Sequence, residues 1–465
     1  MSLLDPQAHA AKSAHGATSL AARFERLPFT GYQKKLGGIL ATCFMLDGID
    51  LNMVSFLLAP ISHDLHLKSG ATGLVASAGF VGMGVGATVA GMLADRWGRR
   101  LVLINSMLVW GIASLLTAFA WNLQSFIAFR VLTGIGIGAE LPVAFALVAE
   151  FMPADRRARL TGWMQMAGNA GNAAFNGLAL AAVAIAGIAL GWRAMFVVMF
   201  VGSLFALYVR RNFPESPRWY ESRGLHDRAD EGMRAIEDEV QRYTGAPLPA
   251  PVAVPTARVD GKERAGLREL LSRNCLSRTI LAWVLWLVVL FAFYGISTWV
   301  GKLLVDRGMS ISKSILVGLL ISLAGIPAAW VVGQAMDRIG RKVVLISALA
   351  LVAVAAFAYG HAASFGLVVA TGAVMQFALT SVATSLYVYS PELFPTRARA
   401  TGMGTASTAG RISAIAGPLA VPPIILAFGY AGTFIAFAIC FLVGAVLVIL
   451  FGPESKGRVL EDVAG

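Results

Sequence analysis

Long apolar segments separated by short polar ones dominate this sequence of 465 residues. A membrane-spanning helix needs about 20 mostly apolar residues, and each segment is close to that length. A soluble surface needs about 25% charged residues, whereas this chain has 14%. We therefore predict an all-α polytopic membrane protein with twelve transmembrane helices, and we exclude a soluble enzyme, a disordered chain and a disulfide scaffold. The apolar segments fall at residues 36–59, 70–94, 101–120, 123–148, 159–186, 193–209, 279–301, 314–336, 343–361, 364–389, 400–426 and 430–451.

The basic side chains are divided unevenly between the polar segments. Alternate segments, beginning with the N-terminal arm, contain 31 Lys and Arg residues, and the others contain 5. Because basic loops stay on the cytoplasmic side, we expect both termini in the cytoplasm and the protein in the inner (plasma) membrane. This asymmetry accounts for the net charge of +12, so nucleic acid is not an expected partner. Residues 1–34 contain no apolar core of a signal peptide.

The sequence lacks the motifs of enzymes and cofactor sites. Cys43, Cys275 and Cys440 lie far apart, without a Cys-x-x-Cys pair or neighbouring histidines, so we expect no metal site. There is no Walker phosphate loop, serine nucleophile elbow or His-Glu-x-x-His motif. Two glycine runs, at 82–86 and 134–138, lie inside apolar segments and indicate close helix packing rather than nucleotide loops. The sequence predicts neither an enzyme nor a bound cofactor.

The two halves of the chain repeat each other. The segment 91–100 (GMLADRWGRR) recurs 242 residues later as 333–342 (GQAMDRIGRK), and a Glu-x-x-Pro motif recurs at the same offset. Parallel repeats of six spans each are characteristic of transporters built from two bundles. Within the polar linker between the halves, 217–244 and 262–274 are predicted to be helical. The expected organisation is an N-terminal arm (1–35), a first six-helix bundle (36–210), a cytoplasmic linker with short helices (211–277), a second six-helix bundle (278–452) and a cytoplasmic tail (453–465).

Three motifs point to a known family. The repeated loop, Gly-x-x-x-Asp-Arg-x-Gly-Arg-Arg/Lys, resembles the hallmark of the major facilitator superfamily. Pro214–Trp219 (PESPRW) resembles its sugar-porter-like branches. Asp47-Gly-Ile-Asp50 with Met53-Val-Ser-Phe56 resembles proton-coupled organic-acid symporters, and within these the nicotinate-transporter branch related to synaptic vesicle glycoproteins. The resemblance implies two pseudo-symmetric six-helix bundles that rock about a central site, in a protein that works as a monomer.

The repeated loops are also candidates for a gate. Glycine permits close backbone approach, aspartate accepts hydrogen bonds from a helix N-terminus or an arginine, and arginine supplies donors. We expect a cytoplasmic latch that breaks and re-forms, extended by the glutamates and arginines that follow spans four and ten. The alternative is that the basic residues only anchor the topology. The expected gating residues are Gly91, Asp95, Arg96, Arg99, Glu150, Arg157, Arg159, Gly333, Asp337, Arg338, Arg341, Glu392, Arg397 and Arg399.

Five charged residues lie well inside apolar segments, away from the segment ends: Asp47, Asp50, Arg130, Glu140 and Arg411. Each costs at least about 2.5–3.5 kcal/mol at mid-membrane, so each needs a partner or a function. Asp47 and Asp50 share a helix face, and Asp50 and Arg130 both lie about 12 Å from the outer membrane surface. If spans one and four are neighbours, as the resemblance implies, Asp50 pairs with Arg130. We expect Asp47, Asp50, Arg130 and Glu140 to couple transport to protons; a static ion pair, or simple packing for Glu140, is the alternative.

Polar stripes run along two of the spans expected at the centre. Span five carries amides at helical spacing, and a threonine stripe in span eleven ends at Arg411. Exposing polar side chains to lipid without hydrogen-bond partners is unfavourable in free energy, so we expect these stripes to face a cavity or a neighbouring helix. Arg411 or Arg130 is the expected anchor for a carboxylate, and aromatic side chains are candidates to stack on a ring, with packing as the alternative. The expected substrate-binding residues are Arg130, Asn169, Asn172, Asn176, Tyr294, Trp299, Gln376, Tyr387 and Arg411.

Together these features predict a secondary active transporter that imports a small aromatic organic acid with protons by alternating access. By resemblance, nicotinate is the first candidate substrate, which makes vitamin uptake the expected role, and benzoate-type acids come next. The expected partners are a small organic anion, protons and the lipid bilayer. Three alternatives stay open: transport of an organic cation or a neutral polyol, a non-transporting membrane receptor or scaffold, and proton-driven efflux.

Overall fold

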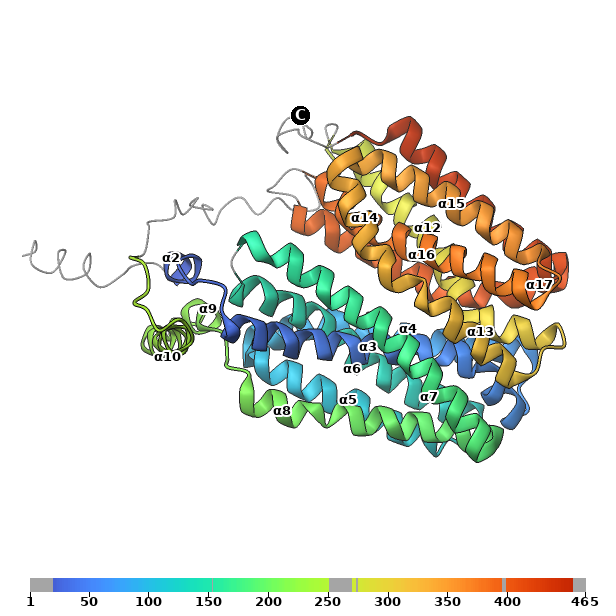
Figure 1. The fold of residues 1–465 in the computed structure, drawn as a ribbon, viewed down its shortest axis with the longest axis horizontal. Helices are drawn as coiled ribbons and strands as arrows, with labels where there is room; N and C mark the ends of the chain where they lie inside the picture. The colour runs from blue at the N-terminus through green and yellow to red at the C-terminus, as the bar shows by residue number, and fades with distance from the viewer. Residues whose placement is uncertain (1–19, 153, 251–269, 273–274, 395–398, 455–465) are drawn as a thin grey trace, which may run out of the picture.

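The chain folds into two helical bundles, shown in Figure 1 with the first in blue to green and the second in yellow to red. The computed structural model describes residues 20–152, 154–250, 270–272, 275–394 and 399–454. Most of these residues are helical, and none of them lies in a strand. The predicted all-α membrane fold is therefore confirmed.

Each bundle supplies six spans. In the described residues, ten helical stretches are long and apolar enough to cross a membrane. The two longest of these each contain two spans, which accounts for twelve. The first bundle consists of α3 (Gly31–Asp64), α4 (Ser69–Trp97), α5 (Arg99–Ala118), α6 (Leu123–Phe151), α7 (Ala154–Ser203) and α8 (Phe205–Asn212). The second consists of α12 (Leu276–Asp306), α13 (Ile311–Leu323), α14 (Gly325–Ile339), α15 (Arg341–His361), α16 (Phe365–Glu392) and α17 (Arg399–Phe451).

Glycines divide the two longest helices, α7 and α17. Gly187 and Gly429 have φ angles of 77° and 70°, in the left-handed region that glycine adopts without strain. Each helix therefore consists of two spans that meet at a glycine. The two glycines are 242 residues apart, which is the offset of the repeated loops. The duplicated sequence thus produces a duplicated turn.

Side-chain caps fix where the first and fourth spans begin. Thr30 Oγ1 accepts a hydrogen bond from the Tyr32 N–H at 3.3 Å, and Gln33 Oε1 accepts one from the Thr30 N–H at 2.9 Å. At the start of α6, Asn122 Oδ1 accepts the Ser125 N–H at 2.8 Å. Such caps satisfy backbone donors that the first helical turn leaves free. They set the starting points of α3 and α6, the helices that carry most of the buried charges.

Glycines let α4 and α6 lie backbone against backbone. A Cβ atom added to Gly82 would overlap the Val131 carbonyl oxygen, and one added to Gly134 would overlap the Gly79 carbonyl oxygen. Gly84, in the same run as Gly82, has nothing within 4 Å of such an atom. The prediction that the glycine runs serve close helix packing is confirmed.

The two ends of the bundles differ. We name the end beside α2 (Leu20–Glu25), α9 (Pro217–Ser222) and α10 (His226–Thr244) the linker end, and the opposite end the far end (Figure 1). α3 runs from the linker end to the far end, and α4 returns.

The bundles touch between their middle and the far end. Ser77 Oγ donates to the Ile415 carbonyl oxygen at 3.0 Å, and Ser55 donates to the Ser297 carbonyl oxygen. All four residues lie in the halves of their helices that are nearer the far end. In the described residues, the two bundles are therefore joined at the far end.

The predicted helical stretch 217–244 is confirmed, but it consists of two helices. Gly224, with φ of 72°, ends α9 and lets α10 begin at His226. Ser216 caps α9 by accepting the Trp219 N–H at 3.4 Å. The second linker helix, predicted at 262–274, lies largely outside the described residues.

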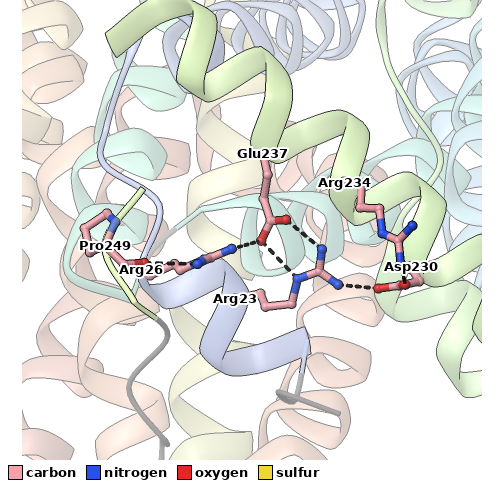
Figure 2. Close-up of polar contacts among 6 residues, drawn as sticks. All are labelled: Arg23, Arg26, Asp230, Arg234, Glu237 and Pro249. Atoms are coloured by element: carbon pink, nitrogen blue, oxygen red, sulfur yellow. Dashed lines mark hydrogen bonds and ion pairs between the residues drawn. The ribbon is translucent and has the colours of Figure 1, made fainter. Parts of the chain in front are cut away.

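Charged side chains hold the N-terminal helix α2 against α10, as Figure 2 shows. Arg23 donates from Nε and Nη2 to the two carboxylate oxygens of Glu237 at 3.0 and 2.6 Å, and it also binds Asp230. Arg26 donates to Glu237 at 2.6 Å and to the Pro249 carbonyl oxygen at 3.0 Å. We name this set of contacts the arm clamp. It attaches the N-terminal arm to the linker.

We expect Arg23→Ala to loosen α10 from the arm. Burial raises the pKa of Glu237, but hydrogen bonds from Arg23 and Arg26 outweigh that effect and hold this pKa below its usual range. The clamp therefore contributes stability above the unfolded pKa of about 4.3 and loses it as the pH falls through the lowered folded value. Losing the Arg23 bonds to this mostly buried carboxylate costs about 1.5–3 kcal/mol. Faster amide hydrogen exchange in α10 is the measurement.

Arg242→Ala is the matched control for the arm clamp. Arg242 also pairs with a glutamate of α10, but their side chains are 76% and 36% exposed. Exposed pairs of this kind contribute about 0.3–0.5 kcal/mol. Equal exchange rates in the two variants would contradict the clamp's role.

Candidate transport site

A buried ion pair joins α3 to α6 in the first bundle. Arg130 Nη2 lies 2.9 Å from Asp50 Oδ2, and Arg130 Nη1 donates to Asp50 Oδ1 at 3.1 Å. Asp50 is fully buried, and Arg130 is 3% exposed. Ser114 of α5 adds a longer hydrogen bond to Asp50, at 3.4 Å. The predicted pairing of Asp50 with Arg130 is confirmed.

Two further acids lie beside this pair. Asp47 is buried one helical turn before Asp50, and neither of its carboxyl oxygens has a hydrogen-bond partner. Its carboxyl group faces that of Glu140, close enough for the two acids to interact. Glu140 Oε2 accepts a hydrogen bond from Trp110 Nε1 at 2.8 Å, and Glu140 Oε1 has no partner. Three carboxyl groups are thus enclosed by α3, α5 and α6.

Arg411 lies where α17 of the second bundle meets α4 of the first. Its Nη1 donates to the Met83 carbonyl oxygen at 3.1 Å. Tyr294 and Tyr387 lie close enough to interact with its charge. Tyr294 also packs edge-on against Phe80 of the first bundle, with ring centres 4.9 Å apart. Among the described residues, no acidic side chain forms an ion pair with Arg411.

Three polar side chains meet around Gly325, where α13 gives way to α14. A Cβ atom on Gly325 would lie 3.2 Å from Thr380 Oγ1, 3.3 Å from Asn169 Oδ1 and 3.5 Å from Gln376 Nε2. Asn169 belongs to α7 and the other two to α16, so this cluster crosses from one bundle to the other. The structure thus brings two of the predicted substrate-binding residues, Asn169 and Gln376, together.

Of the other predicted substrate-binding residues, Tyr294 and Tyr387 lie near Arg411, and the rest are more dispersed. Trp299 is buried, and its Nε1 donates to the Pro418 carbonyl oxygen at 3.0 Å inside the second bundle. Tyr387 is 49% exposed and packs edge-on against Trp286, with ring centres 5.1 Å apart. Farther along α7 than Asn169 lie the last two amides of the stripe, half-buried Asn172 and buried Asn176.

Comparison with known proteins identifies the family. The family model for the Major Facilitator Superfamily matches residues 40–365 and 323–464. This chain is a member of the Major Facilitator Superfamily. It is 31% identical to the niacin transporter of Acinetobacter baylyi, over 96% of this chain and 99% of that one. It is 29% identical to a 4-hydroxybenzoate transporter of the same organism, over 84% of each chain.

Solved structures of the superfamily share the fold. The xylose transporter of E. coli, in a partially occluded inward-open conformation, is 18% identical and has a TM-score of 0.73. The match covers 92% of this chain and 100% of that chain. The superfamily and these relatives are transporters, so this chain is a membrane transporter with the twelve-helix superfamily fold.

The repeated loops of this superfamily member form equivalent ion pairs in the two halves. Arg99 Nε lies 3.2 Å from Glu150 Oε1, and Arg341 Nε lies 3.5 Å from Glu392 Oε1. Each pair joins the loop between the second and third spans of a bundle to the end of its fourth span. The structure thus pairs both glutamates with loop arginines, and their gating role stays a prediction.

The other predicted gating residues are described only in part. Arg96 and Arg338 are exposed, and an added Cβ atom on Gly333 would have nothing within 4 Å. Outside the described residues or side chains lie Gly91, Asp95, Arg157, Arg159, Asp337, Arg397 and Arg399.

Two glutamates that the sequence analysis does not assign to the gate hold these superfamily loops. Glu215 Oε1 accepts the first N–H of α5 at 3.0 Å, and Glu454 Oε1 accepts the first N–H of α15 at 3.1 Å. A carboxylate is favoured at a helix N-terminus. Each glutamate can come this close to the helix only because residues 98 and 340 are glycines. Their φ angles are 103° and 122°, and an added Cβ atom at either position would meet the glutamate. The repeated Pro-Glu-Ser motif is the signal that locates both caps.

Proposed function

We propose that this chain imports a small aromatic carboxylate together with protons, with nicotinate as the first candidate substrate. The observation that carries the proposal is the position of Arg411. It lies where the bundles meet, is bonded to a backbone carbonyl oxygen, and has no acidic partner among the described residues. Arg411 is half-buried, and a partly desolvated guanidinium favours an anionic partner and binds a carboxylate through two parallel hydrogen bonds. Arg130 is the weaker candidate for binding the carboxylate because it already forms an ion pair with Asp50.

The relatives support the aromatic class of substrate. Niacin and 4-hydroxybenzoate, after which two of them are named, each carry a carboxylate on an aromatic ring. In this chain, Tyr294 and Tyr387 lie beside Arg411 and offer faces or edges for a ring. Asn169 and Gln376 offer hydrogen bonds to a ring nitrogen or hydroxyl group.

Proton coupling is assigned to the Asp50–Arg130 pair. Ionised Asp50 neutralises Arg130, whereas a proton on Asp50 removes that attraction and releases the guanidinium. The excess of basic residues assigns the linker end to the cytoplasm. The described state, closed at the far end with the pair formed, then corresponds to the cytoplasm-facing transporter after proton release. The repeated loops at the linker end form the latch that closes in the opposite state.

The proposal is tested by uptake of labelled nicotinate into proteoliposomes. We expect accumulation in the wild type when an inward proton gradient is imposed, and none without it. Arg411→Gln is expected to weaken apparent affinity by about 100-fold, because it removes charge-assisted bonds to the carboxylate. Substrate competition in a binding assay measures the affinity.

Arg242→Gln is the matched control, since it removes an exposed linker arginine that lies far along the chain from the site. If Arg411→Gln leaves carboxylate affinity unchanged, transport of a cation or a polyol becomes the better interpretation. Binding without accumulation in the wild type would instead support a receptor. Displacement by a different carboxylate would change the substrate and keep its class.

A further inference from the structure

Phe56 of the first bundle enters a hole in the surface of the second bundle. A Cβ atom added to Gly318 would lie 2.2 Å from Phe56 Cε1, and one added to Gly301 would lie 3.3 Å from Phe56 Cδ1. Gly301 belongs to α12 and Gly318 to α13, so the hole lies between two neighbouring helices. We name these two residues the glycine socket. Glycine inside a helix is unfavourable relative to alanine, and at both positions it makes room for the ring.

Hydrogen bonds hold the walls of the glycine socket in place. Ser314 Oγ donates to the Gly301 carbonyl oxygen at 2.6 Å, and Ser314 is buried. Gly318 lies one helical turn after Ser314, on the same face of α13. The bond from Trp299 to the carbonyl oxygen of Pro418 holds α12 against α17. The socket is therefore a fixed part of the second bundle, which the ring enters from the first bundle.

The ring and its socket lie where equivalent helices of the two halves meet. Ser55, the residue before Phe56, donates to the Ser297 carbonyl oxygen, and the two serines are 242 residues apart, which is the offset of the repeat. The arrangement around them is not symmetric. The positions equivalent to the ring and to the glycine socket, at the same offset, hold smaller or bulkier residues that cannot repeat it: Thr298, Ala59 and Ala76. The duplicated framework alone therefore does not account for this contact.

Charge contributes little to the joining of the bundles at the far end. The ion pairs that described residues form there, Arg193 with Asp64 and Lys302 with Asp306, each stay within one bundle. The hydrogen bonds that cross between the bundles there run from serine side chains to backbone carbonyl oxygens. Separating the bundles at this end therefore breaks few polar contacts, and it also withdraws an aromatic ring from close packing.

We propose that Phe56 is the plug of a gate at the far end. Seated in the glycine socket, its ring closes the far-end route to the transport site, and its withdrawal opens that route. The inference rests on alternating access in the proposed function and adds a gating residue to it, and it does not depend on the substrate or the coupled ion. A side chain placed in the socket competes with the ring, so it shifts the protein toward the state that is open at the far end.

The experiment measures how fast two engineered cysteines, introduced one at a time, react with a water-soluble maleimide in purified protein. The three native cysteines are replaced by alanine in the reference protein. Ser77→Cys reports on the far end, because Ser77 is buried where the bundles meet. Thr408→Cys reports on the linker end, because Thr408 is exposed one turn from Arg411, on the face of α17 that is turned toward the first bundle.

Gly318→Leu is expected to raise the labelling rate at position 77 by about tenfold or more and to lower the rate at position 408 by a similar factor. Opposite changes at the two ends distinguish a moved gate from unfolding, which would expose both positions. Gly318→Ala places only a methyl group against the ring, so it is expected to give a smaller shift in the same directions.

Gly366→Leu is the matched control for the filled socket. Gly366 lies at the far end of the same bundle, is exposed, and has nothing within 4 Å of an added Cβ atom. This variant is expected to leave both labelling rates unchanged. Equal rates in Gly318→Leu and Gly366→Leu would overturn the inference, and so would faster labelling at both positions in Gly318→Leu.

Phe56→Ala tests the ring itself. It leaves the socket empty, so labelling at position 77 is expected to be faster. When Phe56→Ala is combined with Gly318→Leu, the leucine takes the space of the ring, and both rates are expected to return to within about threefold of the reference protein. A double variant as open as Gly318→Leu alone would overturn the inference. The labelling needs neither nicotinate nor a gradient, so failure of nicotinate uptake would count against the proposed function and leave this result standing.

Discussion

Gly82→Ala is expected to leave little folded transporter, because the added methyl group would overlap the Val131 carbonyl oxygen. The neighbouring atom belongs to the backbone of α6, so no side chain can rotate to make room. Separating α4 from α6 also opens the interface around Gly134. Overpacking of a core typically lowers stability by about 1–3 kcal/mol. Because this clash is with backbone, we expect a loss at or above the upper end of that range. The melting temperature and the yield of monodisperse protein in detergent are the measurements.

Gly84→Ala is the matched control for this substitution. It lies two residues away in the same helix, and an added Cβ atom would have nothing within 4 Å. Since alanine is a better helix former than glycine by about 1 kcal/mol, this variant is expected to be as stable as the wild type or slightly more so. Similar losses in both variants would show that helix propensity or expression, and not the α4–α6 contact, governs the effect.

Asp50→Asn is expected to lower gradient-driven accumulation by about 100-fold or more, because it removes the carboxyl group that we propose to carry the proton. It also leaves a guanidinium that is 3% exposed without its counter-ion. Breaking a buried ion pair in this way costs about 3–5 kcal/mol of stability. Uptake driven by an imposed proton gradient measures the first effect, and thermal unfolding measures the second.

A double variant separates the coupling role of Asp50 from a static structural role. Asp50→Asn with Arg130→Gln removes both charges, so stability is expected to recover toward that of the wild type. Accumulation is not expected to recover, because no carboxyl group that can carry a proton remains at this pair. Recovery of both stability and accumulation would favour the static ion pair.

Residue count predicts the similar depth of Asp50 and Arg130 in the membrane, and the family resemblance supplies the neighbouring spans that let them pair. It does not predict which side chain Asp47 faces, since that depends on the rotation of α6 about its own axis. No sequence pattern predicts the hydrogen bond from Trp110 to Glu140, because a tryptophan in an apolar span cannot be told from one that only packs. The geometry around Glu140 therefore needs coordinates.

Contacts between segments distant in the sequence are likewise poorly predicted. Arg23 and Glu237 are 214 residues apart, and nothing in either local pattern indicates that they meet. Glu215 and Glu454 are different, because their Pro-Glu-Ser motif is repeated. A repeat shows that a residue matters to the fold of both halves, but only the structure shows that it caps a helix.

The arm clamp has a consequence for how motion in this protein can be followed. α2 continues into α3, and Arg23 ties it to α10, so the arm and α10 are carried with the first bundle. α10 therefore lies outside the membrane and is expected to move as one body with the first bundle. A pair of probes, one on the exposed face of α10 and one at the start of α15, would report the rocking of one half against the other. Such probes lie outside the lipid and away from the buried charges, so they leave the transported ions undisturbed.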